Sequence, residues 1–128
     1  MYTWLNSYVT KLQILNPNKY GFRKNHSTHL AISDMCNNIT KSFDDEKAVI
    51  GIFNDFSKAV HTINHNILLH KLNYSGIHGV ALQWFKSYLT SGTQYVNLNN
   101  INSTKKLITC GVPQGSTLGL LLFLLYIY

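Results

Sequence analysis

The sequence predicts an α+β fold with a modest core, and three observations predict it. Apolar residues recur at helical spacing in several separate stretches, an apolar β-branched run stands alone in mid-chain, and two short strand-like segments flank an asparagine-rich loop. Separated helices around a hairpin and a buried strand are typical of the α+β class. A lone strand is not a stable sheet, so the central run needs either the hairpin or residues outside this chain as its partner.

Two helices are predicted in the first third of the chain. A helical stripe covers residues 1–15, and the turn at residues 16–18 ends it. Residues 20–24 follow as a short basic segment, looped or extended. Asn25 or Ser27 can cap the second helix, which ends near an acidic run at residues 44–46 that suits a solvated surface. The apolar positions of this second helix are Ala31, Met35, Ile39 and Phe43.

Three more helices and a hairpin are predicted in the second half. Helical spacing over residues 63–72 stops at Ser75-Gly76, and a further helix over residues 79–89 stops at Ser91-Gly92. The loop of residues 111–116 contains two glycines, which permit close approach of the backbone to a ligand, and its last residue, Ser116, can cap a terminal apolar helix. Strands are expected at residues 94–98 and 105–110, with residues 99–103 as the hairpin loop.

The central run, residues 48–55, carries the chemistry. Its β-branched and aromatic residues indicate a buried strand, and Asp55 stands at the end of that strand. A buried carboxylate costs several kcal/mol to desolvate unless a cation lies beside it. A Mg²⁺ ion bound to substrate phosphates is a common partner for such a carboxylate. The alternative is that Asp55 caps a following helix, and the run by itself leaves both interpretations open.

Composition limits the class of protein and of partner. Of 128 residues, 45% are hydrophobic and 12% are charged, with 11 basic against 5 acidic residues and a net charge of +6, which suits a polyanion such as nucleic acid. Cys36 and Cys110 are expected as free, buried thiols in a reducing compartment. Residues 1–15 lack the pattern of a secretory signal, so an intracellular protein is expected. The apolar run at residues 118–128 is too short to span a bilayer, so no membrane partner is expected.

Five short motifs, in a fixed order, resemble one known family. They resemble the reverse transcriptase domain of non-LTR (LINE) retrotransposons of the jockey-like type, and the resemblance covers nearly the whole chain. It implies the right-hand polymerase fold, with residues 1–47 as fingers-like helices and a basic segment and residues 48–128 as a partial palm. The motifs are YGFRKNHST (20–28), FNDFSKA (53–59), NH (64–65), LQWFKSYL (82–89) and GVPQGS (111–116).

The resemblance also implies roles for individual residues. Asp55 would be the catalytic carboxylate of the first palm motif and a ligand to one of two Mg²⁺ ions, and the Phe56 carbonyl would contact the nucleotide-bound ion. The substrates implied are a deoxynucleoside triphosphate, a DNA primer and an RNA template. The other implied contacts are Lys58 and Ala59 along the triphosphate, Val60 beside the ribose, Gln114 and Gly115 against nucleotide and template, and Arg23 and Lys24 on template or phosphate.

Some positions depart from the family pattern. Val60 stands where an aromatic residue usually blocks a ribose 2′-hydroxyl, so selection of deoxyribose should be loosened. The family takes its remaining catalytic carboxylates from an Ala-Asp-Asp hairpin after the helix that begins at Ser116, and this chain ends before such a hairpin and before the thumb. We therefore expect a decayed, truncated copy without polymerase activity of its own. The remaining departures are Asn54 for an apolar residue, His61 for Asp and Leu120 for Pro.

Two other interpretations stay open at this point. The chain could act as a non-catalytic module that binds nucleic acid through basic residues, in which case binding should weaken steeply with salt. It could also self-associate through its terminal helix, which is apolar on all sides and needs cover. The basic residues of the first alternative are Arg23, Lys24, Lys105 and Lys106.

Overall fold

A computed structural model describes residues 1–113 and 115–128 of the chain. Contacts divide the chain into two units, one of residues 1–14 and 58–128 and the other of residues 15–57, and each is described here by itself. This division rests on contacts alone. The assignment of residues 1–47 to fingers and residues 48–128 to a partial palm stays a prediction.

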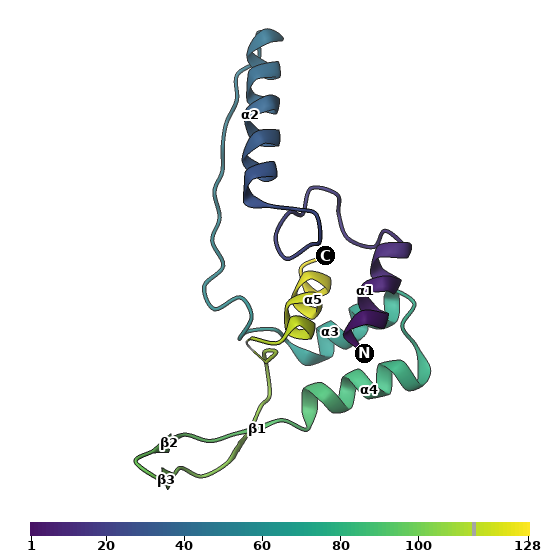
Figure 1. Cartoon of the computed structure of the whole chain (residues 1–128), viewed down its shortest axis with the longest axis vertical. Helices are drawn as coiled ribbons and strands as arrows, with labels where there is room; N and C mark the ends of the chain where they lie inside the picture. The colour runs from purple at the N-terminus through teal and green to yellow at the C-terminus, as the bar shows by residue number, and fades with distance from the viewer. Residues whose placement is uncertain (114) are drawn as a thin grey trace. The chain divides into compact units, whose positions relative to one another are not determined.

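The larger unit is built from four helices, α1 (Tyr2–Lys11), α3 (His65–Tyr74), α4 (Gly79–Thr90) and α5 (Thr117–Tyr126). The helix α3 packs against both α4 and α5, and α1 packs against α5 (Figure 1). Burial of apolar side chains from all four helices is what holds this unit together. Its fully buried side chains include Leu5, Val9, Ile63, Leu68, Leu72, Ile77, Phe85 and Leu122.

The helix α5 has the character that its sequence predicts. Its leucines are buried on several sides, as an all-round apolar helix requires. Ser116 caps it by accepting a hydrogen bond from the Gly119 amide at 2.9 Å. At the other end, Lys71 Nζ donates to the Tyr126 carbonyl at 2.6 Å, which places a cation where the helix dipole is negative. The apolar residues left open at this end are Ile127 and Tyr128.

Helices α2 and α3 end in the same hydrogen-bonded turn. After α3, the Gly76 amide donates to Asn73 and the Ile77 amide to Leu72, which is the Schellman pattern with glycine in the left-handed position (φ 87°). After α2 (Thr28–Asp44), the Glu46 and Lys47 amides make the equivalent bonds to Phe43 and Ser42. There the left-handed position holds a non-glycine residue, Glu46, at φ 56°. Both helices therefore end in a Schellman turn, and the left-handed residue of that turn is less favourable after α2 because it is not glycine.

The hairpin consists of four two-residue strands, β1 (Thr93–Gln94), β2 (Asn97–Leu98), β3 (Ile101–Asn102) and β4 (Lys106–Leu107). They pair antiparallel, β1 with β4 and β2 with β3. Because Leu98 pairs with Ile101, the predicted loop at residues 99–103 is in fact a two-residue turn. Both of its residues, Asn99 and Asn100, have positive φ, the backbone that favours asparagine in tight hairpins.

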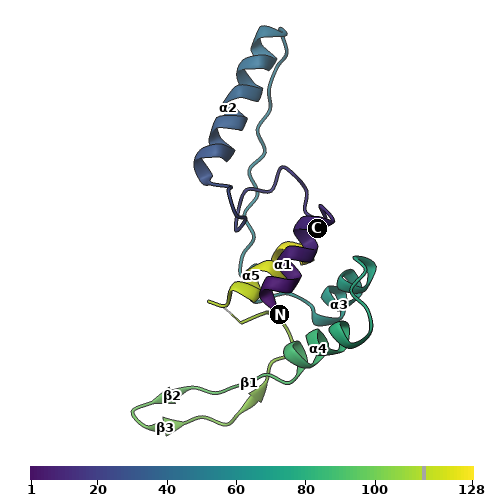
Figure 2. The ribbon, with the colours of Figure 1, turned by 45° about the vertical axis from the view of Figure 1, so that its right-hand side comes forward.

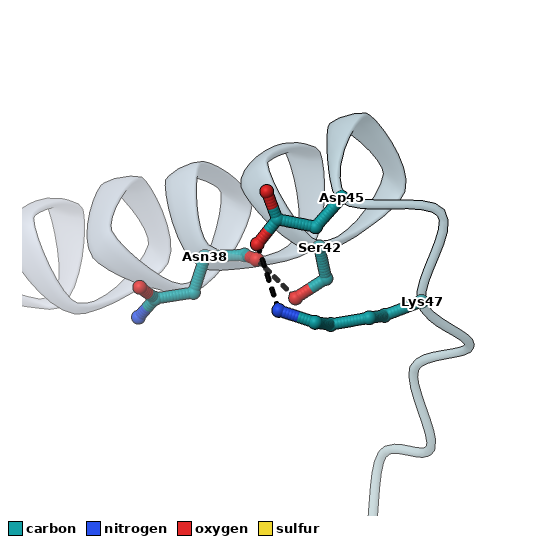
Figure 3. A network of polar contacts seen from close by, with 4 residues as sticks. All are labelled: Asn38, Ser42, Asp45 and Lys47. Carbon is teal, nitrogen blue, oxygen red and sulfur yellow. Dashed lines mark hydrogen bonds and ion pairs between the residues drawn. The ribbon is translucent and has the colours of Figure 1, made fainter.

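The smaller unit is organised around α2. Ser27, not Asn25, caps this helix by accepting a hydrogen bond from the Leu30 amide. The loop before it is braced by Arg23, whose guanidinium donates to the carbonyls of Asn16 at 2.8 Å and Lys19 at 3.0 Å. Tyr20 Oη donates to the Asp34 carboxylate of α2. At the far end of the helix, Lys47 Nζ lies 2.9 Å from Asp45 Oδ2, and both side chains are exposed (Figure 3).

The predicted buried strand at residues 48–55 is wrong for this structure. The segment is extended but belongs to no strand, and it runs back beside α2 (Figures 1 and 2). Ile50, Ile52 and Phe53 are 87%, 80% and 85% exposed. The physical reason is that a strand is held by hydrogen bonds to a neighbouring strand, and none of the described strands pairs with this segment. An apolar, β-branched pattern indicates that a segment can form a strand, but the neighbouring strand that it must pair with is not part of that pattern.

Smaller expectations about burial are also corrected. Their helical spacing predicts Trp4, Trp84 and Phe85 as core aromatics, but Trp4 and Trp84 are 45% and 39% exposed and only Phe85 of the three is buried. Cys36 and Cys110 are free, as predicted, but exposed instead of buried. The acidic run at residues 44–46 is solvated, as expected.

Candidate nucleotide-binding site

Two segments far apart in sequence are joined by backbone hydrogen bonds within the larger unit. The Gly111 amide donates to the Ile63 carbonyl at 2.8 Å, and the Val112 amide donates to the Val60 carbonyl at 3.1 Å. Asn64 and Cys110 form an isolated antiparallel bridge beside them. The structure therefore brings together the segment that follows the FNDFSKA motif and the start of the GVPQGS loop.

His65, the first residue of α3, stabilises this junction with a side-chain hydrogen bond. Its ring is buried, and Nε2 donates to the Gly111 carbonyl at 2.7 Å. Asn64 caps the same helix by accepting from the amides of Asn66 and Ile67, so the cap fixes the first turn from which His65 reaches the loop. The position of His65 in the NH motif predicts a packing residue, and its side chain is buried. The hydrogen bond to Gly111 was not foreseen, because residues 46 positions apart carry no local signal of contact.

Residues 58–62 form a tight turn at the edge of the junction. Lys58 adopts the left-handed conformation (φ 55°), and its carbonyl accepts hydrogen bonds from the amides of His61 at 2.8 Å and Thr62 at 3.2 Å. Among the described residues, the backbone N–H groups of Lys58, Ala59 and Val60 donate no hydrogen bond. Successive free amides around a left-handed residue form a concave arrangement that attracts anions.

The two glycines of the 111–116 loop have different roles. Gly111 has φ 82°, and a Cβ there would lie 2.8 Å from the His61 carbonyl oxygen, so the position is closed by packing. Gly115 has φ 84°, is exposed, and a Cβ there would meet nothing within 4 Å. Only Gly115 is therefore open to a ligand. Its neighbour Gln114, also predicted for the site, lies outside the described residues.

Asp55 and Phe56 belong to the smaller unit. Asp55 is exposed and makes no hydrogen bond or ion pair among the described residues. No helix begins at Asp55, and the next one, α3, is capped by Asn64, so the alternative that Asp55 is a helix cap is wrong. Phe56 is 68% exposed. The structure thus joins Val60 to the start of the glycine loop within the larger unit, whereas Asp55 and Phe56 belong to the smaller unit.

The predicted nucleic-acid contacts also lie in the smaller unit. Arg23 uses its guanidinium on loop carbonyls, as described above, so its role in this structure is to brace the loop. Lys24 is exposed, and its side chain makes no hydrogen bond or ion pair with another described residue. Across the described residues, no three or more His, Cys, Asp or Glu side chains gather to hold a metal ion. No described helix is both long and apolar enough to cross a membrane.

Comparison with known proteins assigns the chain to a family. Residues 1–128 match the family described as "Reverse transcriptase (RNA-dependent DNA polymerase)". Three relatives from Drosophila melanogaster are the "Probable RNA-directed DNA polymerase from transposon BS", 32% identical over 125 residues, the "RNA-directed DNA polymerase from mobile element jockey", 31% over 101, and the "Probable RNA-directed DNA polymerase from transposon X-element", 29% over 119. The alignments cover 93%, 79% and 92% of this chain. No solved structure matches it.

The alignments span only 13%, 11% and 13% of the lengths of those three relatives. They agree with the resemblance to jockey-like retrotransposons on which the residue roles were predicted. The chain therefore belongs to the reverse transcriptase (RNA-dependent DNA polymerase) family, and its relatives are polymerases of non-LTR retrotransposons.

Proposed function

We propose that this chain supplies part of the active centre of an RNA-directed DNA polymerase. In that reaction a primer 3′-hydroxyl attacks the α-phosphorus of a deoxynucleoside triphosphate, and the bond to pyrophosphate breaks. The chain would contribute one catalytic carboxylate and a cradle for the incoming nucleotide. The observation that carries the proposal is the junction of residues 60–65 with residues 110–112, because it ties the turn at residues 58–62 to the start of the glycine loop.

The triphosphate would lie against residues 58–60. The N–H groups of Lys58, Ala59 and Val60 make no hydrogen bond to another described residue and can donate to phosphate oxygens, and the exposed Lys58 side chain adds a positive charge. Backbone donors held in a fixed turn bind an anion without losing further conformational entropy. This supports the contacts predicted for Lys58 and Ala59.

The sugar and base would be placed by Val60 and the glycine loop. The Val60 carbonyl accepts from the Val112 amide, so this residue keeps its position relative to the start of the glycine loop. Valine is smaller than the aromatic residue usual in the family, so we expect weaker exclusion of a ribose 2′-hydroxyl. Gly115 offers open backbone for close approach of nucleotide and template, and Gln114 is proposed to contact them too.

Asp55 would be one ligand in the metal chemistry on which this family depends, with the Phe56 carbonyl as a neighbouring contact. Positioning two Mg²⁺ ions requires carboxylates converging from more than one strand. The described residues fail this requirement, because they contain no cluster of three or more ligating side chains. We therefore propose that this chain does not polymerise on its own.

A non-catalytic nucleic-acid-binding module is the second candidate. It is favoured by Lys24, which is exposed and whose side chain makes no hydrogen bond or ion pair with another described residue. It is also favoured by Lys105 and Lys106 on the hairpin, where Lys105 Nζ lies 6.0 Å from the Tyr95 ring centroid. Such binding should weaken steeply as salt rises, because phosphate contacts release counterions. A titration of single-stranded RNA at two salt concentrations, comparing Lys24→Gln with Lys11→Gln, separates this role from simple solubility.

The polymerase proposal is best tested in a chimera. This chain would replace the segment to which it aligns in the jockey polymerase, and primer extension on an RNA template would be measured. We expect activity that Asp55→Asn abolishes and that Asp45→Asn, at another exposed acid, leaves intact. The same chimera should incorporate ribonucleotides more readily than its Val60→Phe variant. An active chimera that tolerates Asp55→Asn would contradict the proposed role.

A further inference from the structure

The peptide group between Gly111 and Val112 is held on both of its sides by one distant segment of the chain. Its carbonyl, that of Gly111, accepts from His65 Nε2 at 2.7 Å, and its N–H, that of Val112, donates to the Val60 carbonyl at 3.1 Å. Because a trans peptide group is planar, its C=O and its N–H point in opposite directions and can only turn together. The histidine bond and the Val60 bond therefore fix the orientation of the same rigid group.

The preceding peptide group does not fix this orientation. The Gly111 amide, which donates to the Ile63 carbonyl at 2.8 Å, belongs to the peptide group between residues 110 and 111. The two peptide groups meet at the Cα of Gly111, where φ is 82° and where glycine permits rotations that a Cβ would restrict. Among the described residues, His65 is the one donor to the Gly111 carbonyl. Without it, the 111–112 group is held in this structure by the Val60 bond alone.

His65 combines a hydrogen bond with packing, and the two contributions can be separated on one helix. A carbonyl oxygen can only accept, so Nε2 of His65 carries the proton. The side chain is 5% exposed and Gly111 is buried, so water does not replace the bond. Leu68 lies about one turn further along α3 and is also fully buried, but its side chain has no hydrogen-bonding group. A truncation of Leu68 therefore weakens the packing of α3 without removing a donor from the loop.

We propose that His65 is a positioning residue that sets the sugar selectivity of the nucleotide site by fixing the 111–112 peptide group and, through it, Val60. This inference rests on the proposed function, in which Val60 lies beside the sugar. Val60 is half-buried, and when the peptide group turns, its carbonyl loses the donor that ties it to the glycine loop. A shift of Val60 changes how the sugar is held without moving a group that reacts. It should therefore alter KM and sugar preference more than kcat.

Amide hydrogen exchange in the full chain tests the structural part of the inference without any need for polymerase activity. The Val112 and Gly111 amides are bonded to different carbonyls, so they report on the two peptide groups separately. His65→Phe keeps the bulk without the donor, and it should speed the exchange of Val112 about fivefold relative to that of Gly111. Leu68→Ala is the matched control and should speed both amides by the same factor, because it weakens the core of the unit as a whole.

Steady-state kinetics in the jockey chimera test the effect on substrate choice. His65→Phe should raise the KM for deoxynucleotides about fivefold, lower the preference for deoxynucleotides over ribonucleotides, and change kcat by less than about twofold. His65→Gln should restore the original values, because its carboxamide N–H reaches about as far as Nε2 of the imidazole. His65→Asn is one methylene shorter and should behave like His65→Phe, whereas Leu68→Ala should leave KM and sugar preference unchanged.

The outcomes distinguish this inference from the proposed function. A chimera that is inactive, or that tolerates Asp55→Asn, contradicts the proposed function, and the exchange of Val112 in the full chain still decides whether His65 holds the peptide group. The inference is overturned if His65→Phe and Leu68→Ala have the same effect on the exchange of Val112 relative to Gly111. It is also overturned if an active chimera keeps its KM and sugar preference in both His65→Phe and His65→Asn. If His65→Phe does not fold, His65→Asn replaces it in both measurements.

Discussion

His65 Nε2 donates a hydrogen bond of 2.7 Å to the Gly111 carbonyl, across 46 residues of sequence. Both groups are buried, so neither can use water in place of the other. This contact anchors the glycine loop to the first turn of α3, and with it the loop's hydrogen bonds to Val60 and Ile63. The geometry of the candidate nucleotide site therefore depends on a residue that does not line it.

Removing the imidazole should destabilise the larger unit. His65→Ala leaves a buried carbonyl without a donor and opens a cavity, so we expect a loss of about 2–4 kcal/mol in the free energy of unfolding. Urea unfolding followed by circular dichroism measures it. His65→Phe keeps the bulk without the donor and should recover only part of the loss. Equal stability of His65→Ala and the original chain would contradict the anchoring role.

The two loop glycines should respond differently to a methyl group. Gly111→Ala forces a Cβ to within 2.8 Å of a backbone oxygen at positive φ, so we expect at least about 3 kcal/mol of destabilisation. Gly115→Ala meets open space and should cost only about 1 kcal/mol, from its left-handed backbone. The thermal unfolding midpoints of the two variants give the comparison. Similar midpoints would show that the 111 position is not closed by packing.

The ends of α2 and α3 provide a reciprocal pair of substitutions. Glu46→Gly relieves a left-handed non-glycine residue and should stabilise the smaller unit by about 1 kcal/mol. Gly76→Ala introduces the same strain after α3 and also places a Cβ 2.5 Å from the Tyr8 hydroxyl, so it should destabilise the larger unit by more than that. Hydrogen exchange of the amides in α2 and in α3 measures the stability of the smaller and the larger unit separately. If the amides of α2 exchange faster in the Glu46→Gly variant than in the original chain, the left-handed backbone at Glu46 is not strained.

Tyr20 should titrate at higher pH than an ordinary tyrosine. Its hydrogen bond to the Asp34 carboxylate raises the pKa of Tyr20 above the usual 10.0, because the neutral phenol donates and the phenolate cannot. The raised pKa means that the bond contributes fully below pH 10 and is lost as pH rises through the folded-state value.

The eight tyrosines of the chain overlap in absorbance, so Tyr20 is isolated by subtracting the titration of a Tyr20→Phe variant. Asp34→Asn should return the pKa of Tyr20 toward the ordinary value. If the difference titration matches that of free tyrosine in the original chain, the Tyr20–Asp34 bond does not form in solution.

Local features of the fold could be predicted from the sequence, and non-local ones could not. The helix around Met35 and the cap at Ser116 follow from periodicity and side-chain chemistry within a few residues. The segment around Ile52 has a strand-like pattern, but its structure depends on a hydrogen-bonding partner that no local pattern supplies. Trp84 shows a second limit of local patterns. A helical stripe indicates which face of a helix packs against the core, but not how much of each side chain the core covers.

The candidate site divides along the same line. Asp55 and the glycine loop stand out from the local sequence pattern, and their roles were assigned through resemblance to a family whose motifs occur in a fixed order. The backbone hydrogen bond between Val112 and Val60 depends on chain topology, and no sequence spacing predicts it. The split role of Gly111 and Gly115 likewise appears only when the surroundings of each Cα are known.

The most direct test of the account is primer extension by the purified chain on an RNA template, with Mg²⁺ or Mn²⁺ and all four deoxynucleotides. We expect no extension, because the described residues contain no group of three or more side chains that could hold a metal ion. Extension that disappears in the Asp55→Ala variant would show that this chain assembles a complete catalytic centre, and would contradict the account.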